Sequence, residues 1–225
     1  MLNRKTKLAA SLTAAAVTSI LTVATSAQVV YENGFEGYAG QRTSPANGIV
    51  GDVVGLTQQG VLSSASFGYF LSPTLRSGDE TASLSIYSLD AGGLPGTLLF
   101  SSGAFSITGT TAEGFGTLNV DNILTFVPSS IGYTITFGGL TGGEEAGLLF
   151  SNDPTLIGTN PTFFDTVTSA QEHFTIRNNG GTFERLNFPG VVDNLNASFT
   201  VVPEPSTFAL MLGGLAAMRF LRRRK

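Results

Sequence analysis

Short runs in which apolar and small polar residues alternate dominate the middle of this chain. In residues 65–72 an apolar side chain recurs at every second position, which is the period of a β-strand rather than of an α-helix. The same period recurs in three further runs, namely residues 83–87, 133–137 and 194–202. The pattern therefore predicts an all-β fold over residues 28–202, built as a single β-sandwich of jelly-roll-like type.

Turn signals rich in glycine and asparagine separate the alternating runs. They are Asp90-Ala91-Gly92-Gly93, Thr141-Gly142-Gly143, Asn152-Asp153-Pro154 and Asn178-Asn179-Gly180-Gly181. Runs that recur about every 10–15 residues favour a sandwich. Residues 31–60 are richer in glycine and polar residues, and we expect this segment to wrap an edge of the sandwich.

Residues 1–27 have the organisation of a secretory signal peptide. A basic start, Arg4, Lys5 and Lys7, precedes the small and apolar residues 8–24. Small residues then lead to Ala27, after which we expect cleavage. The sequence therefore predicts an N-terminal signal helix that is removed on export. A permanent N-terminal membrane anchor is the alternative.

Residues 203–225 combine a proline hinge, an uncharged apolar run over 208–218 and a cluster of arginines. As a helix, that run would be about 16 Å long, whereas a bilayer core is about 30 Å thick. The sequence thus predicts a short hydrophobic helix that anchors weakly, with its basic end on the cytoplasmic side. The alternative, an ordinary last helix of a soluble domain, fits an apolar run with a basic end poorly. The strand before the hinge would hold the domain close to the membrane.

Pro203, Glu204 and Pro205, together with the apolar run and the basic end, resemble the PEP-CTERM sorting signal. The resemblance implies export through the general secretion machinery and transient retention in the inner membrane. It also implies removal of the tail by an exosortase, a membrane-embedded transpeptidase-like protease, with these three residues as the recognition motif. Members of this family occur in Gram-negative bacteria that make extracellular polysaccharide. Exopolysaccharide is therefore an implied partner, and the cell surface or the extracellular space is the implied destination.

Residues 65–151 resemble the choice-of-anchor domains, which are exported bacterial ectodomains paired with different surface-attachment signals. The resemblance rests on the Gly-rich hairpin over residues 83–100. Such domains have no assigned catalysis, so this resemblance implies an architecture rather than an activity.

The charge of the exported part disfavours nucleic acid and anionic lipid as partners. Between the two terminal segments the only basic residues are Arg42, Arg76, Arg177 and Arg185, whereas all 16 acidic residues lie between Glu32 and Glu204. Four positive and 16 negative charges give a formal charge of −12, and phosphates are bound by Lys and Arg. The chain has no cysteine, which excludes disulfides and thiol chemistry.

The sequence does not predict an enzyme. His173 is the only histidine, so a catalytic triad would have to combine it with Asp165 or Asp193. A glycosidase would instead need two carboxylates about 5–9.5 Å apart. The candidate carboxylates, Asp79, Glu80, Glu113, Glu144 and Glu145, lie beside turn glycines, and we expect them to be solvated turn residues.

Calcium is the best ion candidate, although no cofactor is required by the sequence. Calcium takes oxygen ligands from acidic, amide and backbone groups, and Asp121, Asp153 and Asp193 each lie beside an asparagine. These three residues are the metal candidates, without the spacing of an EF-hand. Two further patterns are interpreted as chance: the glycosylation triplet that begins at Asn196, and the pair Thr134 and Thr136, spaced as in ice-binding strands.

Taken together, the sequence predicts an exported protein with a structural or adhesive role, associated with exopolysaccharide or biofilm. The alternative is a carbohydrate-binding, lectin-like jelly roll that is assisted by calcium. A hydrolase is a third reading, with less support.

Overall fold

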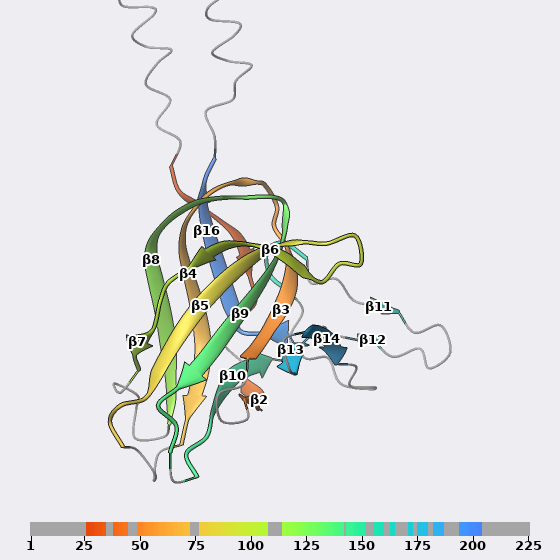
Figure 1. Cartoon of the computed structure of the whole chain (residues 1–225). Helices are drawn as coiled ribbons and strands as arrows, with labels where there is room; N and C mark the ends of the chain where they lie inside the picture. Colours follow the sequence, from red (N-terminus) through yellow and green to blue (C-terminus); the bar gives the residue numbers. More distant parts are fainter. Residues whose placement is uncertain are drawn as a thin grey trace, which may run out of the picture. The chain divides into compact units, whose positions relative to one another are not determined.

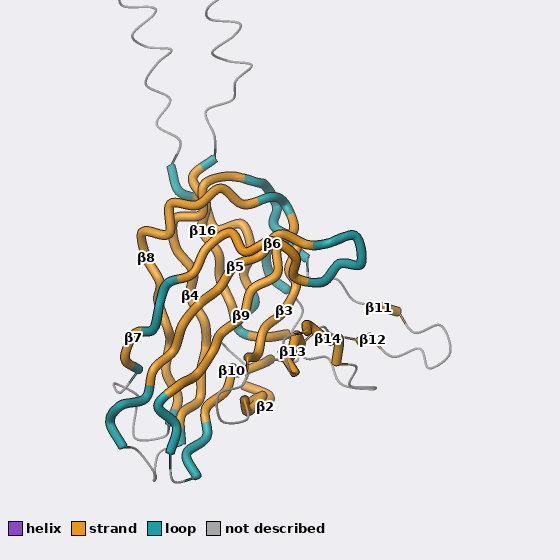
Figure 2. The backbone as a smooth tube through the Cα atoms, in the orientation of Figure 1, coloured by secondary structure: helices purple, strands orange, loops and turns teal. Residues whose placement is uncertain are grey.

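The computed structural model of the chain describes residues 26–34, 38–44, 49–72, 77–107, 114–141, 143–151, 155–159, 163–164, 171–172, 175–179, 182–186 and 194–203. The two predicted terminal helices lie outside these residues and stay predictions. Every regular element within them is a strand, which confirms the all-β prediction (Figure 1). Figure 2 shows the same path as strands joined by loops and turns.

The strands follow the chain with connections of varied length. Their bounds are β1 Gln28–Glu32, β2 Tyr38–Ser44, β3 Ile49–Gly55, β4 Gly60–Leu71, β5 Thr81–Leu89, β6 Pro95–Ser101, β7 Phe105–Ser106, β8 Phe115–Val127, β9 Ser130–Gly138, β10 Ala146–Ser151, β11 Phe163–Phe164, β12 Gln171–Glu172, β13 Thr175–Asn179, β14 Thr182–Leu186, β15 Asn194–Leu195 and β16 Ala197–Val202.

The first sheet, which we call sheet A, has seven strands in the order β1-β16-β4-β10-β15, with β2 also paired to β10 and β8 also paired to β4. Its pairs are antiparallel. β8 pairs along β4 from Phe115, opposite Phe70, to Val127, opposite Gly60. Because β4 is its only partner strand among the described residues, β8 forms an edge of the sheet.

The second sheet, sheet B, has seven strands in the order β14-β13-β3-β9-β5-β6, with β7 paired to β5. Its pairs are also antiparallel, and β11 and β12 form a separate small pair. The expected wrapping of residues 31–60 around an edge is wrong for β3. This strand lies between β9 and β13, so it is an interior strand of sheet B.

The predicted hairpin over residues 83–100 is present as the antiparallel pair of β5 and β6. Asp90 organises its turn, because its Oδ1 accepts the backbone N–H groups of Gly92 at 2.8 Å and Leu94 at 2.9 Å. Gly93 has a φ of 73°, a left-handed conformation that glycine adopts without steric cost.

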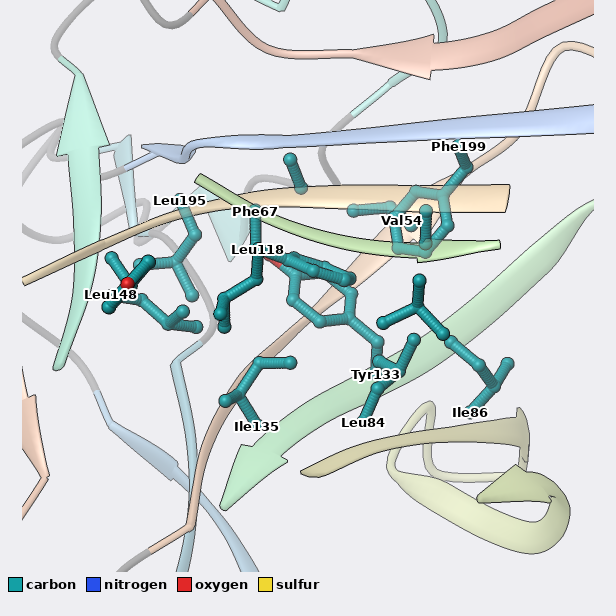
Figure 3. Packing of buried hydrophobic residues seen from close by; sticks show 14 of the residues in the cluster. Val54, Phe67, Leu84, Ile86, Leu118, Tyr133, Ile135, Leu148, Leu195 and Phe199 are labelled. Atoms are coloured by element: carbon teal, nitrogen blue, oxygen red, sulfur yellow. The ribbon is translucent and has the colours of Figure 1, made fainter. Parts of the chain in front are cut away.

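The two sheets pack face to face and bury the alternating apolar residues between them. On β9, Tyr133, Ile135 and Phe137 are fully buried, as the period-two pattern predicts. Phe67 of sheet A and Tyr133 of sheet B meet with ring centroids 5.1 Å apart. Figure 3 shows this packing together with Phe199, Leu84 and their neighbours. The β-sandwich is therefore confirmed.

Side chains from the strands of sheet B cover part of its own outer face. Phe183 of β14 packs on Tyr87 of β5, with ring centroids 5.3 Å apart. Over β9, a Cβ at Gly132 would lie 3.1 Å from Cγ of Pro95 and 3.5 Å from Cδ2 of Leu89.

Candidate functional site

β16 is an interior strand of sheet A, and it leads directly into the predicted sorting signal. It pairs with β1 on one side and with β4 on the other. Its last residue, Val202, lies opposite Val61, and Pro203 follows directly. Proline has no N–H with which to continue the ladder, so the strand ends there. A strand that runs straight into the hinge was predicted, and the end of β16 at Val202 confirms it.

The two predicted processing positions lie at the same end of sheet A. β1 and β16 are antiparallel, with Gln28 opposite Val201, and opposite Cα atoms in such pairs are about 4.5–5.5 Å apart. Ala27, the predicted cleavage position, precedes Gln28 and is exposed. Pro203 lies two residues beyond Val201 in the chain. The folded domain therefore begins and ends on neighbouring strands (Figure 1).

The middle of the outer face of sheet A carries small polar side chains. Ser66 of β4 lies opposite Ser198 of β16 and Asn119 of β8, and its Oγ donates a hydrogen bond of 2.6 Å to Oδ1 of Asn119. The next row along the strands repeats the arrangement. We call these six residues the hydroxyl face: Ser64, Ser66, Asn119, Asp121, Ser198 and Thr200.

The hydroxyl face is accessible and has little charge. Its members are half-buried or exposed, and they alternate along β4 with the buried residues Ala65 and Phe67. Asp121 is the only ionisable residue among the six. Such a surface offers hydrogen-bond donors and acceptors that suit uncharged polar ligands.

Only one of the three calcium candidates can be placed. Asp121 is an exposed residue of β8, whereas Asp153 and Asp193 lie outside the described residues. Within the described ranges, no group of three or more histidine or acidic residues is placed to hold a metal ion. Structural calcium therefore stays a prediction. Of the catalytic candidates, His173 and Asp165 also lie outside the described residues.

Two acidic residues expected to be solvated in turns are buried instead, so that expectation is wrong for them. Glu80 is fully buried and Glu144 is 9% exposed, whereas Asp79 and Glu145 are exposed as predicted. Each buried carboxylate accepts backbone N–H groups of nearby loops, which the local sequence does not indicate.

Glu144 joins two loops at one end of the sandwich. Its carboxylate accepts the backbone N–H of Ser77 at 2.6 Å and that of Thr141 at 2.7 Å. Ser77 lies between β4 and β5, and Thr141 between β9 and β10, so one side chain closes both loops. Glu80 similarly accepts the N–H of Gly78, at 3.2 Å from each carboxylate oxygen. Both carboxylates are therefore engaged in stabilising loops.

Glu144→Ala should lower the free energy of unfolding by about 2 kcal/mol, because hydrogen bonds to charged groups contribute about 1.5–3 kcal/mol. Glu144→Gln should lose less, because the amide oxygen can still accept one N–H. Urea unfolding of the two variants beside the parent protein measures the difference. Equal stability of Glu144→Ala and the parent would contradict the structural role.

The core contains a buried acidic residue that the sequence analysis did not single out. Asp52 is fully buried and lies opposite Tyr133 in the pairing of β3 with β9. Its Oδ1 accepts the backbone N–H of Val53 at 2.8 Å. The sequence pattern could have indicated this burial. Asp52 lies two residues from Val50 and two residues from Val54, so the three side chains point to the same, inward face of the strand.

Two core tyrosines lie near this carboxylate. Burial, and then the negative charge of Asp52, raise the pKa of Tyr133 well above its ordinary value. The same two causes raise the pKa of Tyr31, and the nearby side chain of Thr155 opposes them only in part. Both phenols therefore keep their protons to a higher pH than an exposed tyrosine does.

Two minor patterns of the sequence are buried in the structure. Thr134 is 1% exposed, so the pair with Thr136 does not form an exposed ladder of the kind that ice binding needs. Asn196 is 3% exposed, and its Cβ would lie 3.1 Å from a Cβ placed on Gly68. The glycosylation triplet is therefore inaccessible in the folded protein, in agreement with its interpretation as chance.

One comparison with known proteins identifies the C-terminal segment. A family model described as the PEP-CTERM protein-sorting motif matches residues 201–225. No curated protein and no solved structure matches the chain. The resemblance to choice-of-anchor domains therefore stays a prediction. In the part of the chain that the structure describes, no helix has the length and apolarity to cross a bilayer.

The matched segment begins at Val201, inside β16, and continues through Pro203, Glu204 and Pro205. The sorting motif therefore begins within the last strand of the sandwich, and no linker sequence lies between the two. Such a signal implies export and processing by an exosortase, after a transient stay at the membrane. The chain therefore carries a PEP-CTERM sorting signal at residues 201–225, which supports export, processing by an exosortase and a transient membrane-anchored route to the cell surface.

Proposed function

We propose that the sandwich is a non-enzymatic structural or adhesive protein of the extracellular polysaccharide matrix, or biofilm, and that its hydroxyl face contacts neutral polysaccharide. The observation that carries this proposal is the accessible array of serine, threonine and asparagine side chains across β8, β4 and β16. Hydroxyl and amide groups can both donate and accept hydrogen bonds, as sugar hydroxyls do.

Charge favours a neutral polymer over an acidic one. The segment between the signal peptide and the apolar tail has a formal charge of −12, from 4 basic and 16 acidic residues. An acidic polysaccharide would be repelled, and the repulsion would be screened only as salt is added. Binding to a neutral polymer should therefore change little with ionic strength.

A role without catalysis is supported by the state of the acidic residues. Glu80 and Glu144, two of the candidates for acid–base chemistry, accept backbone N–H groups of loops. A general acid or base must instead reach the substrate and exchange a proton with it. A panel of polysaccharide substrates incubated with the secreted protein should release no soluble sugar.

Ser66→Glu places a charged side chain in the centre of the hydroxyl face and should weaken binding to neutral polysaccharide by about tenfold, or 1.4 kcal/mol. The matched control is Ser83→Glu on β5, a half-buried serine of the outer face of sheet B, opposite Thr136. Co-sedimentation of the secreted protein with neutral polysaccharide measures both. Equal loss in the two variants, or no binding by the parent, would contradict the proposal.

The calcium-assisted lectin is the alternative, and the same assay distinguishes it. Binding that a chelator abolishes, and that Asp121→Asn weakens, would favour the lectin. Binding that withstands the chelator supports the proposed metal-independent contact. Asp121 is the appropriate residue because it is both a calcium candidate and a member of the hydroxyl face.

A further inference from the structure

Apolar side chains replace the hydroxyl face at the end of sheet A from which the sorting signal continues. Val202 of β16 lies opposite Val61 of β4, which in turn lies opposite Phe126 of β8. Phe126 is 44% exposed, and its neighbour Leu124 is 74% exposed. On the other side of β16, Val29 of β1 is 41% exposed and lies opposite Thr200, where the apolar residues border the hydroxyl face. We call these five residues the apolar band.

The orientation of the band follows from the alternation along its strands. Leu62, Val127 and Val201, each adjacent in sequence to a member of the band, are fully buried in the core. Val61, Phe126 and Val202 must therefore point away from the core, because successive side chains of a strand point to opposite faces. The outer face of sheet A is thus divided into a hydroxyl face and an apolar end.

An unusual backbone conformation holds Leu124 in the solvent. Leu124 has a φ of 52° and Asn122 a φ of 58°, in the left-handed region that non-glycine residues seldom adopt. The pairing of β8 with β4 shifts at this point, between Leu62 and Ser64. Such irregularities re-aim side chains and recur at functional positions. Such exposure of a large apolar side chain indicates a surface that contacts an apolar partner at some stage.

We propose that the apolar band docks on the lipid bilayer surface while the sorting signal anchors the chain. Five residues separate Val202 from Phe208, where the apolar run begins. The six Cα–Cα steps from Val202 to Phe208 reach at most about 22 Å when fully extended, so the end of sheet A that carries the band cannot move far from the bilayer. Bilayer interfaces accept exposed leucine and phenylalanine side chains.

The apolar band should bind the bilayer through apolar contacts and not through the charge of the lipid headgroups. None of its five residues is basic, so attraction to anionic headgroups contributes nothing, and zwitterionic lipid should serve. The strength of interfacial binding scales with the apolar area that is buried. Five side chains make a small area, so the contact depends on the tether and ends when an exosortase removes it. The band would thus fix the orientation of the hinge before cleavage without preventing release afterwards.

The absence of tryptophan from the chain makes a direct test possible. Full-length Phe126→Trp is reconstituted in phosphatidylcholine vesicles that contain a lipid with a nitroxide quencher near the headgroup. The matched control is Phe115→Trp, at the opposite end of β8. Their partners on β4, Phe70 and Val61, are nine residues apart, which corresponds to about 30 Å of strand. We expect a blue-shifted emission and at least about twofold stronger quenching for Phe126→Trp than for the control.

Two further measurements make each outcome decisive. Adding Leu124→Ser to Phe126→Trp should reduce the quenching, with circular dichroism confirming that the fold is retained. Equal quenching at the two tryptophan positions would overturn the proposal. It would also be overturned by a blue shift that appears in detergent without vesicles and grows with protein concentration, because a second copy of the chain would then cover the band.

Discussion

Replacing Phe199 by alanine is expected to lower the free energy of unfolding by about 3–5 kcal/mol, the usual range for a buried phenylalanine. Phe199 lies on β16 and is fully buried. Its ring centroid lies 5.3 Å from that of Tyr133, 5.6 Å from that of Phe67 and 5.9 Å from that of Tyr31. The substitution would leave a cavity among three large rings, and close-packed surroundings relax only in part.

Urea unfolding at neutral pH measures this loss, and Phe126→Ala is the matched control. Phe126 has the same side chain and also lies in sheet A, but it is 44% exposed. Its replacement should cost less than about 1 kcal/mol, since partly exposed side chains leave no closed cavity. Similar losses in the two variants would show that Phe199 is not central to the core. A large loss at Phe199 alone would place the centre of the core on the strand that leads into the sorting signal.

The strands that sequence alone could predict are those in which apolar residues alternate with small polar residues or glycine. β4, β5, β9 and β16 each contain a run in which apolar residues recur at every second position. That period arises because the pleat of a strand sends alternate side chains to opposite faces. These four strands contribute much of the core, so their recognition was sufficient to predict the fold class.

β3 could not be placed in the same way, because tertiary contacts override its local composition. Glycine and aspartate are depleted from strands, and β3 contains Gly51, Asp52 and Gly55. The structure shows why Gly51 is required in an interior strand. A Cβ at that position would lie 1.9 Å from the backbone oxygen of Tyr133, so only glycine permits this close approach.

The part of the candidate site formed by consecutive residues could be predicted from the sequence. The part that depends on which strands pair, and in which register, could not. Pro203, Glu204 and Pro205 form a contiguous motif that can be recognised without a structure. That Gln28 lies opposite Val201 depends on the register of two strands from opposite ends of the domain. The contacts of Glu144 with Ser77 are equally non-local, which is why an acid beside turn glycines was expected to be solvated.

Raising the pH above about 10, the ordinary pKa of tyrosine, is expected to destabilise the sandwich steeply. The pKa values of Tyr31 and Tyr133 are raised in the folded state, so these phenols lose their protons first in the unfolded chain. Their contribution is therefore fully present below the unfolded pKa. Above it, the free energy of unfolding falls by about 1.4 kcal/mol per pH unit for each tyrosine. Two such groups give about 2.7 kcal/mol per pH unit.

Urea unfolding at a series of pH values from about 9 to about 11 measures this slope, and Tyr133→Phe assigns it. The variant should lose about half of the slope, because one titrating phenol is removed. At neutral pH it should be as stable as the parent or slightly more so, since the hydroxyl of Tyr133 is buried and has no hydrogen-bond partner among the described residues. A slope that Tyr133→Phe leaves unchanged, or tyrosinate absorbance from all five tyrosines of the folded protein near pH ~10, would show that these phenols ionise freely. In that case Asp52 and the core around it could not be holding them in the protonated form.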